Sequence, residues 1–407
     1  MPVSDRTDPP RARRVLETLT SALAMLRRTA RPLGVECVTL AQAGGRILAK
    51  PVHARIDSPR RDAAAMDGFA VAEARAGEPG QRWRLTAPDS LEDFALAAGS
   101  AIRIATGAPL PAGTVRVLPI EDAVQAGGYV SVDGAAATRS HIRRSGSDFR
   151  RGAMVVAAGR RIDPRALVAM AAADVGDVPV LRAPRVAVVV LGGNHVDPGT
   201  AAAGDYAIPE SLGQALLLFA TVWGGVPTSA IRVGDDPVAF AAAVGALRDV
   251  ADVIVLVGGA AHGARTATRE ALVPLGFMLG FDGLAVRPGR PTWSGTLGPA
   301  HVLALPGNPT AAMTVARLLL APLLVLLGGG NADTALVWED VPLASPAAAT
   351  GDRESFLCAV AETGTVRLFD RGLVSGPVML AAADRLVARP ANGPALAVGM
   401  PVPTLRF

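Results

Sequence analysis

The chain has 407 residues, of which 50% are hydrophobic and 19% are charged, and its formal net charge is +4. This apolar fraction supplies packed cores, so global disorder is excluded, and the length allows about two to four domains. The arginines form short, scattered clusters without interleaved aromatic residues, so no nucleic-acid partner is predicted. Cys37 and Cys358 have no CxxC partner, which argues against a zinc site and a disulfide framework.

The N-terminal half of the chain begins with a polar, proline-rich stretch without the apolar core of a signal sequence. A disordered tail and a cytoplasmic protein are therefore expected. Leucines from Leu16 to Leu26 recur at spacings of three and four and predict an amphipathic helix that ends before Pro32. Short strand-like segments between Gly, Pro and Asp turns follow, and they are typical of a β-rich region.

From about residue 183 the pattern changes to strands that alternate with helices. The run "PRVAVVVLGG" is continuously apolar and β-branched, as in strands covered on both faces. The alternation predicts a parallel, doubly wound α/β sheet. The most apolar run, residues 310–330, carries Arg317 and Pro322, which favour a buried helix over a membrane span. No membrane partner is expected.

These patterns predict a multidomain chain of the α/β class with additional β-rich domains. The predicted parts are a tail of residues 1–13, a helix and strand linker domain of residues 14–50 and 146–182, a β-rich domain of residues 51–145, an α/β domain of residues 183–330, and a small C-terminal β domain of residues 331–407.

Three strands of the α/β region end in glycine turns that lead into helices, at residues 192–193, 258–259 and 307. Glycine lets the backbone approach a ligand, and a helix N-terminus offers free N–H groups. Ordinary turn chemistry would explain one such turn, whereas their recurrence favours an anionic, phosphorylated ligand at the carboxyl edge of the sheet. No GxGxxG or Walker A lysine is present, so a dinucleotide or nucleoside triphosphate site is not predicted.

Several polar residues near turns have both a functional and a plain structural interpretation. His195 and His262 each follow a glycine turn and can ligate a metal, bind phosphate or move protons, or they are polar loop residues. Asp67 and Thr106 lie in turns at strand ends, where capping is the ordinary interpretation. Asp148 lies among four arginines in "RRSGSDFRRG", as an ion-pair partner or as a metal ligand beside a phosphate-binding surface.

Taken in order, these blocks resemble a known family. The chain carries "RRDAAAMDGFAV", "RIATGAPLPAG", "RRSGSDFRRGAMVV", "DVIVLVGGAAHG", "VRPGRP" and "LALPGNPTAAM". The series is similar to the molybdenum insertases of the MoeA and gephyrin type, the molybdopterin molybdenumtransferases, from about residue 14 to the C-terminus. The resemblance implies an elongated four-part subunit that forms a homodimer. It also implies a central MoaB/Mog-like domain that binds molybdopterin, and a pocket completed by the partner's β-rich domain.

The resemblance also implies the reaction and the site. In molybdenum cofactor biosynthesis, molybdenum from molybdate is inserted into adenylylated molybdopterin with Mg²⁺, and AMP is released. The expected ligand-binding residues are Gly192, Gly193, Gly258, Gly259, Gly263, Arg287, Arg290, Pro306, Gly307, Asn308 and Pro309. The expected catalytic residues at the dimeric pocket are Asp148, Asp67 and Thr106. The candidate metal ligands are Asp148, Glu210, His195 and His262.

Most of the family's acids are replaced in this chain. A family GDE string is Gly-Gly-Asn at residues 192–194, a D-x-N string falls on Ile208 and Glu210, and an Asp after the next glycine turn is Thr266. Because Mg²⁺ prefers charged oxygen ligands, two hypotheses stay open. One is an active insertase with substitute ligands. The other is a catalytically impaired paralogue that binds molybdopterin or the molybdenum cofactor as a carrier, chaperone or regulator, with other cofactor biosynthesis proteins or molybdoenzymes as partners. The sequence also leaves molybdenum and tungsten open.

Overall fold

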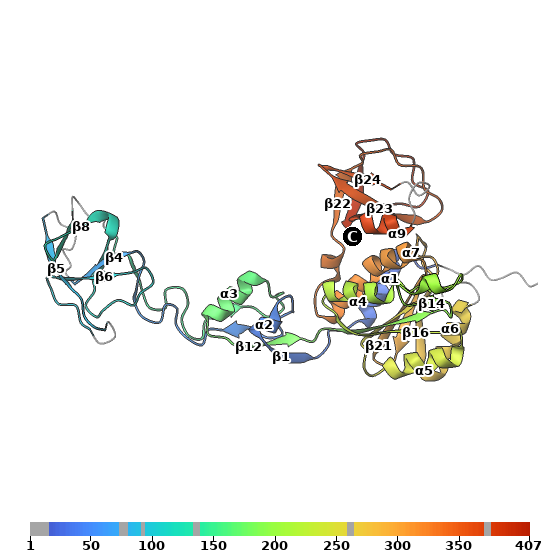
Figure 1. The fold of residues 1–407 in the computed structure, drawn as a ribbon, viewed down its shortest axis with the longest axis horizontal. Helices are drawn as coiled ribbons and strands as arrows, with labels where there is room; N and C mark the ends of the chain where they lie inside the picture. Colours follow the sequence, from blue (N-terminus) through green and yellow to red (C-terminus); the bar gives the residue numbers. More distant parts are fainter. Residues whose placement is uncertain (1–15, 73–79, 91–93, 133–138, 259–263, 370–375) are drawn as a thin grey trace, which may run out of the picture. The chain divides into compact units, whose positions relative to one another are not determined.

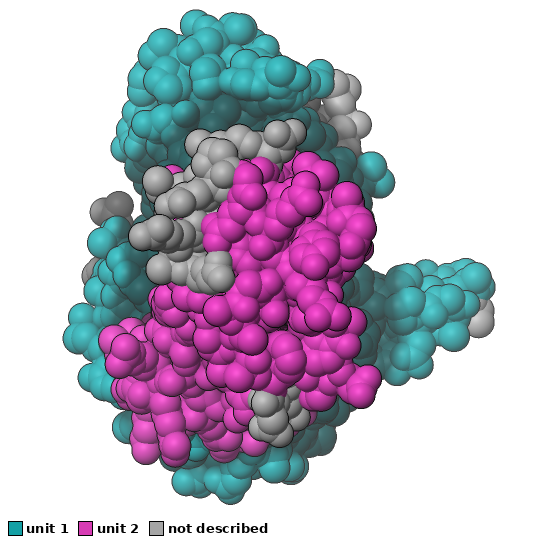
Figure 2. Space-filling model, turned by 90° about the vertical axis from the view of Figure 1, so that its left-hand side faces the viewer, with its two compact units in different colours: residues 1–36, 181–407 teal, residues 37–180 magenta. Residues whose placement is uncertain are grey.

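The computed structural model describes residues 16–72, 80–90, 94–132, 139–258, 264–369 and 376–407. The chain divides into two compact units, residues 1–36 with 181–407 and residues 37–180, which have different colours in Figure 2. The stretch 1–13, predicted to be a disordered tail, lies outside the described residues.

The unit of residues 37–180 is built mainly of strands, as predicted. Its largest sheet has six strands in the order β7-β4-β6-β5-β9-β8, around the buried side chains of Phe69, Trp83 and Leu118. Asp163 caps the N-terminus of α3 by accepting a hydrogen bond from the Ala166 N–H at 2.8 Å, which explains the proline-initiated helix that the sequence predicts. The elements are α2 (Leu40–Ala43), β2 (Val52–His53), β3 (Ala63–Ala64), β4 (Gly68–Val71), β5 (Arg82–Thr86), β6 (Ser100–Ile104), β7 (Arg116–Pro119), β8 (Ala123–Ala126), β9 (Tyr129–Val132), β10 (Ile142–Arg143), β11 (Met154–Val156) and α3 (Pro164–Ala172). At the ends of this unit in the sequence, β1 (Val35–Thr39) pairs with β12 (Asp177–Leu181).

The other unit contains a second six-stranded sheet, in the order β16-β13-β17-β21-β20-β18. Its strands are β13 (Arg185–Leu191), β16 (Val226–Val233), β17 (Val253–Val257), β18 (Phe277–Asp282), β20 (Trp293–Leu297) and β21 (Ala300–Leu305). The first four in spatial order are parallel, which confirms the doubly wound α/β prediction. Two further strands that the sequence analysis does not predict, β20 and β18, extend this sheet by antiparallel pairing, because no crossover helix separates β18 from β20 or β20 from β21.

Helices cover both faces of this sheet (Figure 1). One face carries α1 (Leu19–Thr29), α4 (Gly213–Val222) and the helix 309–327, made of α7 (Pro309–Val315), a π-helical turn (Ala316–Leu320) and α8 (Ala321–Leu327). The other carries α5 (Pro237–Leu247) and α6 (Ala264–Leu272). Side chains along β13 alternate between the two faces, with Val188 in one core and Val189 in the other. The continuous apolar run therefore fits a strand covered on both sides.

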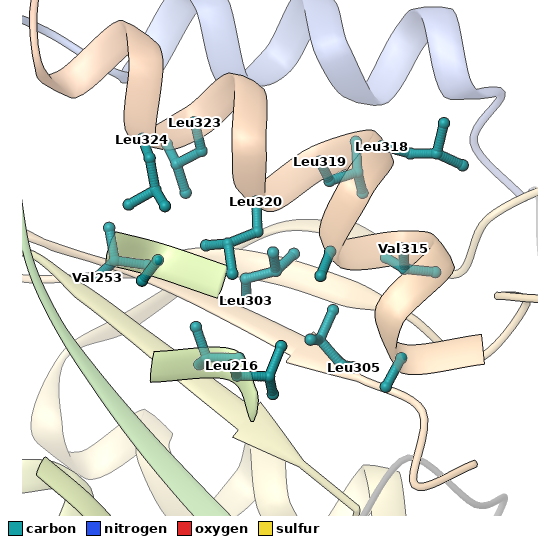
Figure 3. Close-up of a cluster of buried hydrophobic side chains, with 14 of the residues drawn as sticks. Leu216, Val253, Leu303, Leu305, Val315, Leu318, Leu319, Leu320, Leu323 and Leu324 are labelled. Atoms are coloured by element: carbon teal, nitrogen blue, oxygen red, sulfur yellow. The ribbon is translucent and has the colours of Figure 1, made fainter. Parts of the chain in front are cut away.

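The helix 309–327 is long and apolar enough to cross a membrane, yet 78% of its most apolar stretch is buried in the fold. Figure 3 shows its leucines, among them Leu320 and Leu324, packed against Leu303 of β21 and Val253 of β17. It is a core helix, as its arginine and proline predict. The N-terminal helix α1 adds Leu19 and Leu26 to the same core, although the sequence analysis grouped it with residues 146–182.

The C-terminal residues form a third six-stranded sheet, β19-β23-β25-β26-β22, with β24 paired to β23. Its elements are β19 (Val286–Arg287), β22 (Trp338–Pro342), β23 (Glu354–Glu362), β24 (Thr365–Leu368), α9 (Gly376–Ala382), β25 (Arg385–Arg389) and β26 (Pro401–Arg406). The string "GPVMLAA", predicted as part of a β domain, is the helix α9, where proline at the first turn and alanine favour a helix. The finer domain boundaries stay a prediction.

Candidate functional site

The order of the parallel strands creates a switch point at the carboxyl edge of the α/β sheet. The chain runs from β13 to β16 on one side of β13 and then crosses to β17 on the other. The connections that leave β13 and β17 therefore diverge, and ligands of open α/β sheets bind in the crevice that such a switch point creates.

The glycine turns of three strands meet at this place. Gly258 follows β17 with φ +83°, and a Cβ on it would lie 2.7 Å from the backbone oxygen of Leu191, the last residue of β13. A Cβ on Gly307, after β21, would lie 3.6 Å from the Cα of Gly258. Only glycine fits at position 258, both for its φ and for its space. The structure thus brings the expected turns together, while Gly259 and Gly263 lie outside the described residues.

The turn after β21 leads directly into a helix. Pro306 ends the strand region, Pro309 is the first residue of α7, and the side chain of Asn308 caps the helix by accepting from the Ala311 N–H at 3.1 Å. The first N–H groups of a helix lack intrahelical partners and carry the positive end of its dipole. The arrangement therefore suits an anion beside Gly307.

Two arginines flank a tight turn that packs against the same helix. Gly289, at φ +132°, lies so close that a Cβ would be 2.8 Å from Cγ2 of Val315 in α7. Arg287 and Arg290 on either side of it are exposed. Over the described ranges of the chain, neither guanidinium has an ion-pair partner. Both cations thus remain available to a ligand phosphate.

The turn after β13 is occupied by the side chain of His195. A Cβ on Gly192, whose φ is +139°, would lie 2.6 Å from His195 Nδ1, so the ring packs onto this glycine. Nδ1 is buried and has no hydrogen-bond partner in the described part of the molecule. Beside it, Arg232 donates to the His195 carbonyl at 3.2 Å and pairs with Asp197 at 3.0 Å. Together with Gly193, these residues line a hollow of about 440 Å³.

Glu210, the candidate metal ligand of the α/β domain that carries a carboxylate, serves local structure. Glu210 Oε1 accepts from the N–H groups of Leu212 and Gly213 at 2.6 and 2.9 Å, and so caps α4. His262 lies outside the described residues. Within the ranges that are described, no three His, Cys, Asp or Glu side chains come together as a metal site.

In the other unit, Asp67 and Thr106 contact each other. Asp67 Oδ1 accepts from the Thr106 N–H at 2.6 Å and from its hydroxyl at 2.8 Å. The hydrogen bonds from the Thr106 backbone and side chain lower the pKa of Asp67 below its usual value. The sequence predicts each residue separately in a turn, and the structure shows that the two form one hydrogen-bonded corner.

Asp148 is an ion-pair partner. Its Oδ2 accepts from Arg143 Nη2 at 2.5 Å and from the Ser58 hydroxyl at 3.0 Å, and the hydrogen bond from Arg143 lowers its pKa. A hollow of about 1160 Å³ in this unit is lined by Pro59 and Gly107, the residues that follow Ser58 and Thr106 in the chain. The other residues that line it include the basic side chains Arg60 and Arg61.

Two acids that sequence analysis did not single out organise these regions. Asp62 accepts from the Ser145 N–H at 2.8 Å and from Arg144 at 2.6 Å, which fixes the arginine-rich loop that carries Asp148. The hydrogen bond from the Ser145 N–H is the main cause that lowers the pKa of Asp62. Asp62 lies in the string "SPRRDAAA", and its partner Arg144 belongs to a second arginine cluster. An acid beside arginines is the sequence signal that could have identified it. Asp252, which directly precedes β17, accepts from Arg182 Nη1 at 2.7 Å and from the Arg185 N–H at 2.8 Å.

Comparison with known proteins agrees with this arrangement. Residues 17–174 match the "MoeA N-terminal region (domain I and II)", and residues 187–325 match a "Probable molybdopterin binding domain". A molybdopterin molybdenumtransferase of Synechococcus elongatus is 33% identical over 76% of this chain and 78% of that protein. Molybdopterin molybdenumtransferase 2 of Mycobacterium tuberculosis is 31% identical over 74% and 76%.

A solved structure of the same kind covers nearly the whole chain. The crystal structure of a molybdopterin biosynthesis MoeA protein from Pyrococcus horikoshii superposes with a TM-score of 0.78 at 28% identity. The match covers 96% of this chain and 99% of that one. The order of sequence blocks, the two matched domains and the curated relatives agree: the chain belongs to the molybdopterin molybdenumtransferase (MoeA) family of molybdenum cofactor biosynthesis.

Proposed function

We propose that this chain inserts molybdenum from molybdate into adenylylated molybdopterin and releases AMP, acting as a cytoplasmic homodimer. The observation that carries the proposal is the meeting of the glycine turns of β13, β17 and β21 at the switch point of the sheet. Such turns beside a helix N-terminus are suited to phosphate groups, and adenylylated molybdopterin carries a pyrophosphate.

The residues at this edge would hold the substrate in place. Backbone N–H groups of the turns bind phosphate oxygens, and the absence of a side chain at Gly258 lets the ligand approach the sheet. Arg287 and Arg290 supply charged donors, each with a wide planar fork that matches two phosphate oxygens. Together these groups neutralise and orient the pyrophosphate at the bond that is cleaved.

The β-rich region contributes acceptors. The hydrogen bonds on Asp67 and Asp148 lower the pKa of both carboxyls, so both groups are ionised at neutral pH. An ionised carboxylate accepts hydrogen bonds and cannot supply a proton. We therefore assign Asp67, Thr106 and Asp148 to positioning substrate in a pocket that the homodimer completes.

Magnesium belongs to the family reaction, but the described residues do not fit a Mg²⁺ site. Mg²⁺ needs oxygen ligands in a nearly octahedral arrangement. Glu210 already caps α4, Asp148 is paired with Arg143, and the buried atom that His195 offers is a nitrogen and not an oxygen. The hypothesis that Asp148, Glu210, His195 and His262 replace the family's ligands therefore stays a prediction, and we assign no step to the metal.

The use of Glu210 as a helix cap favours a second candidate function. A chain that keeps the glycine turns, while Glu210 caps a helix and Asp148 is ion-paired, can bind molybdopterin or the finished cofactor without inserting the metal. It would then act as a carrier, chaperone or regulator toward other cofactor biosynthesis proteins or molybdoenzymes.

One experiment separates the two candidates. Purified protein is mixed with adenylylated molybdopterin and molybdate, with and without Mg²⁺, and AMP is measured by chromatography. Insertion predicts AMP release that Asp148→Asn reduces at least about tenfold, since a charged hydrogen bond is lost. Asp333→Asn, which removes a comparable surface ion pair with Arg27, is the matched control. Tight binding without AMP release would establish the second candidate, and the absence of both would reject the two together.

A further inference from the structure

An ion pair joins α6, the helix that follows the β17 turn, to the strand β18. Nη1 of Arg269 in α6 lies 2.7 Å from Oδ2 of Asp282, the last residue of β18. The two side chains are only 16% and 19% exposed, so solvent screens this pair less than it screens the exposed pairs on the surface. The pair is therefore a firm link between the helix and the strand.

Asp282 lies at the base of the loop 283–292, which carries the two unpaired arginines of the site. It is the last residue of β18 that pairs with β20, where its Cα partner is Trp293. Above this base, the Leu284 N–H donates to the Arg290 carbonyl at 3.1 Å and closes the loop. Since β20 is antiparallel to both β18 and β21, Asp282 lies at the same carboxyl edge as the glycine turns. A shift of Asp282 would therefore shift the arginine loop.

Arg269 holds the middle of α6. This helix, Ala264–Leu272, has nine residues and follows the turn that begins with Gly258. A helix this short is not stable alone, so its contacts with the rest of the domain determine where it lies. The fully buried Leu272 fixes its C-terminal end in the core, and Arg269 fixes its middle to β18. In the order β17-β21-β20-β18, the pair thus links the helix after β17 to the far end of the sheet.

We propose that Arg269 and Asp282 are positioning residues of the phosphate site. Their ion pair holds the glycine turn of β17 and the arginine loop at the spacing that a bound pyrophosphate requires, and neither side chain has to touch the ligand. Displacing groups that hold a ligand by about 1 Å can cost about 100-fold in rate, so a link between two binding elements has a large effect. The inference rests on the phosphate binding of the proposed function, but it does not require that molybdenum is inserted.

Calorimetry of the whole protein with inorganic pyrophosphate tests the proposal. Asp282→Asn keeps the shape of the side chain and removes its charge, and we expect the affinity to fall about tenfold. Arg269→Gln should show the same loss, and the double variant should lose no more than either single variant, because the two residues act as one pair. Arg269→Lys should recover part of the affinity because the charge returns, a rescue that a failure to fold cannot produce.

Asp252→Asn is the matched control. Asp252 is also a largely buried carboxylate paired with arginines on this sheet, but it lies at the amino edge. Both variants should lose stability in urea unfolding, and only Asp282→Asn should lose pyrophosphate affinity. Native affinity in Asp282→Asn, an equal loss in Asp252→Asn, or no pyrophosphate binding by the native protein would overturn the proposal.

AMP release by the same samples separates this inference from the proposed function. If the native protein releases AMP while Asp282→Asn keeps its pyrophosphate affinity, only the positioning role is rejected. If the affinity falls in Asp282→Asn but the native protein releases no AMP, only the insertion reaction is rejected.

Discussion

The two edges of the α/β sheet differ in how their charged side chains are paired. At the amino edge, Asp252 directly precedes β17 and is 8% exposed. Arg182 and Arg185 pair with it at 2.7 and 3.2 Å, and the Arg185 N–H adds a hydrogen bond at 2.8 Å. At the carboxyl edge, Arg287 and Arg290 are exposed and have no ion-pair partner in the part of the chain that is described.

Charged side chains at the amino edge are bound to each other and stabilise the fold, whereas Arg287 and Arg290 at the carboxyl edge are left for a ligand. A carboxylate with several protein donors is already satisfied, so binding a ligand there would break existing hydrogen bonds. Within the described residues, Arg287 and Arg290 have no ion pair that a ligand would have to break. The charges at the amino edge are therefore expected to stabilise the fold, and those of Arg287 and Arg290 at the carboxyl edge to bind the ligand. Variants at each edge can test that division.

The largest effect is expected at Gly258. In Gly258→Val, the new Cβ would meet the Leu191 carbonyl at 2.7 Å in a backbone of positive φ, so the turn must move. We expect molybdopterin binding to fall by about 100-fold or more and the free energy of unfolding to fall by about 3 kcal/mol. The control is Gly276→Val, with nearly the same φ but open space around it, which should cost about 1–2 kcal/mol and leave binding unchanged. Calorimetry and urea unfolding measure both quantities.

A variant at Asp252 should lose stability without losing molybdopterin binding. Asp252→Ala leaves two partly buried guanidinium groups without their carboxylate, and we expect a loss of about 3 kcal/mol in the free energy of unfolding. Molybdopterin affinity should not change in the folded protein. Asp249→Ala, at an exposed acid nearby, is the control for charge alone. A strong loss of binding by folded Asp252→Ala would contradict the division between the edges.

The same carboxylate predicts a dependence of stability on pH. Burial alone would raise the pKa of Asp252, but the hydrogen bonds from Arg182 and Arg185 lower it from 3.8 to about 2. Its contribution is therefore complete above about pH 4 and is lost as the pH falls toward 2, by about 2 kcal/mol in all. Urea unfolding at stepped pH should show this loss in the native sequence and not in Asp252→Ala.

Much of the fold can be predicted from the sequence because its patterns are local. The continuous apolar runs of β13, β17 and β21 have cores on both faces, and the alternation with helices gives the doubly wound arrangement. The strands β18 and β20 were not predicted. β18 pairs antiparallel with β20, and β20 with β21, and no helix connects the members of either pair. The alternation of strand and helix patterns that identifies the parallel strands is therefore missing here.

The site could be predicted only in part. Glycine turns are visible in the sequence, and the structure brings those of β13, β17 and β21 together. The ion pair of Asp148 could be expected from the arginines around it, but other bonds of the acids depend on partners far along the chain. Ser58 donates to Asp148, and Arg182 pairs with Asp252. The sequence is compatible with Glu210 as a metal ligand, whereas its position three residues before the first residue of α4 makes it a cap.

At the carboxyl edge, each arginine should contribute a moderate amount to binding alone. Arg287→Gln and Arg290→Gln each remove a charged donor, and we expect molybdopterin affinity to fall about tenfold in each variant. The free energy of unfolding should stay within about 0.5 kcal/mol, because both side chains are exposed. Arg28→Gln, at an exposed arginine of α1, is the control. Unchanged affinity in both variants would mean that the ligand does not reach this turn.

The smallest effect is expected at Glu210, where it distinguishes a helix cap from a metal ligand. Glu210→Ala removes the acceptor for the Leu212 and Gly213 N–H groups and should cost about 1 kcal/mol of unfolding free energy. Glu210→Gln keeps a side-chain oxygen for those groups, so it should recover most of that stability. A cap predicts that any AMP release by Glu210→Gln is unchanged, because the helix is still held. A metal ligand predicts the opposite, since an amide lacks the charge that Mg²⁺ prefers, and AMP release would then fall steeply while stability is kept.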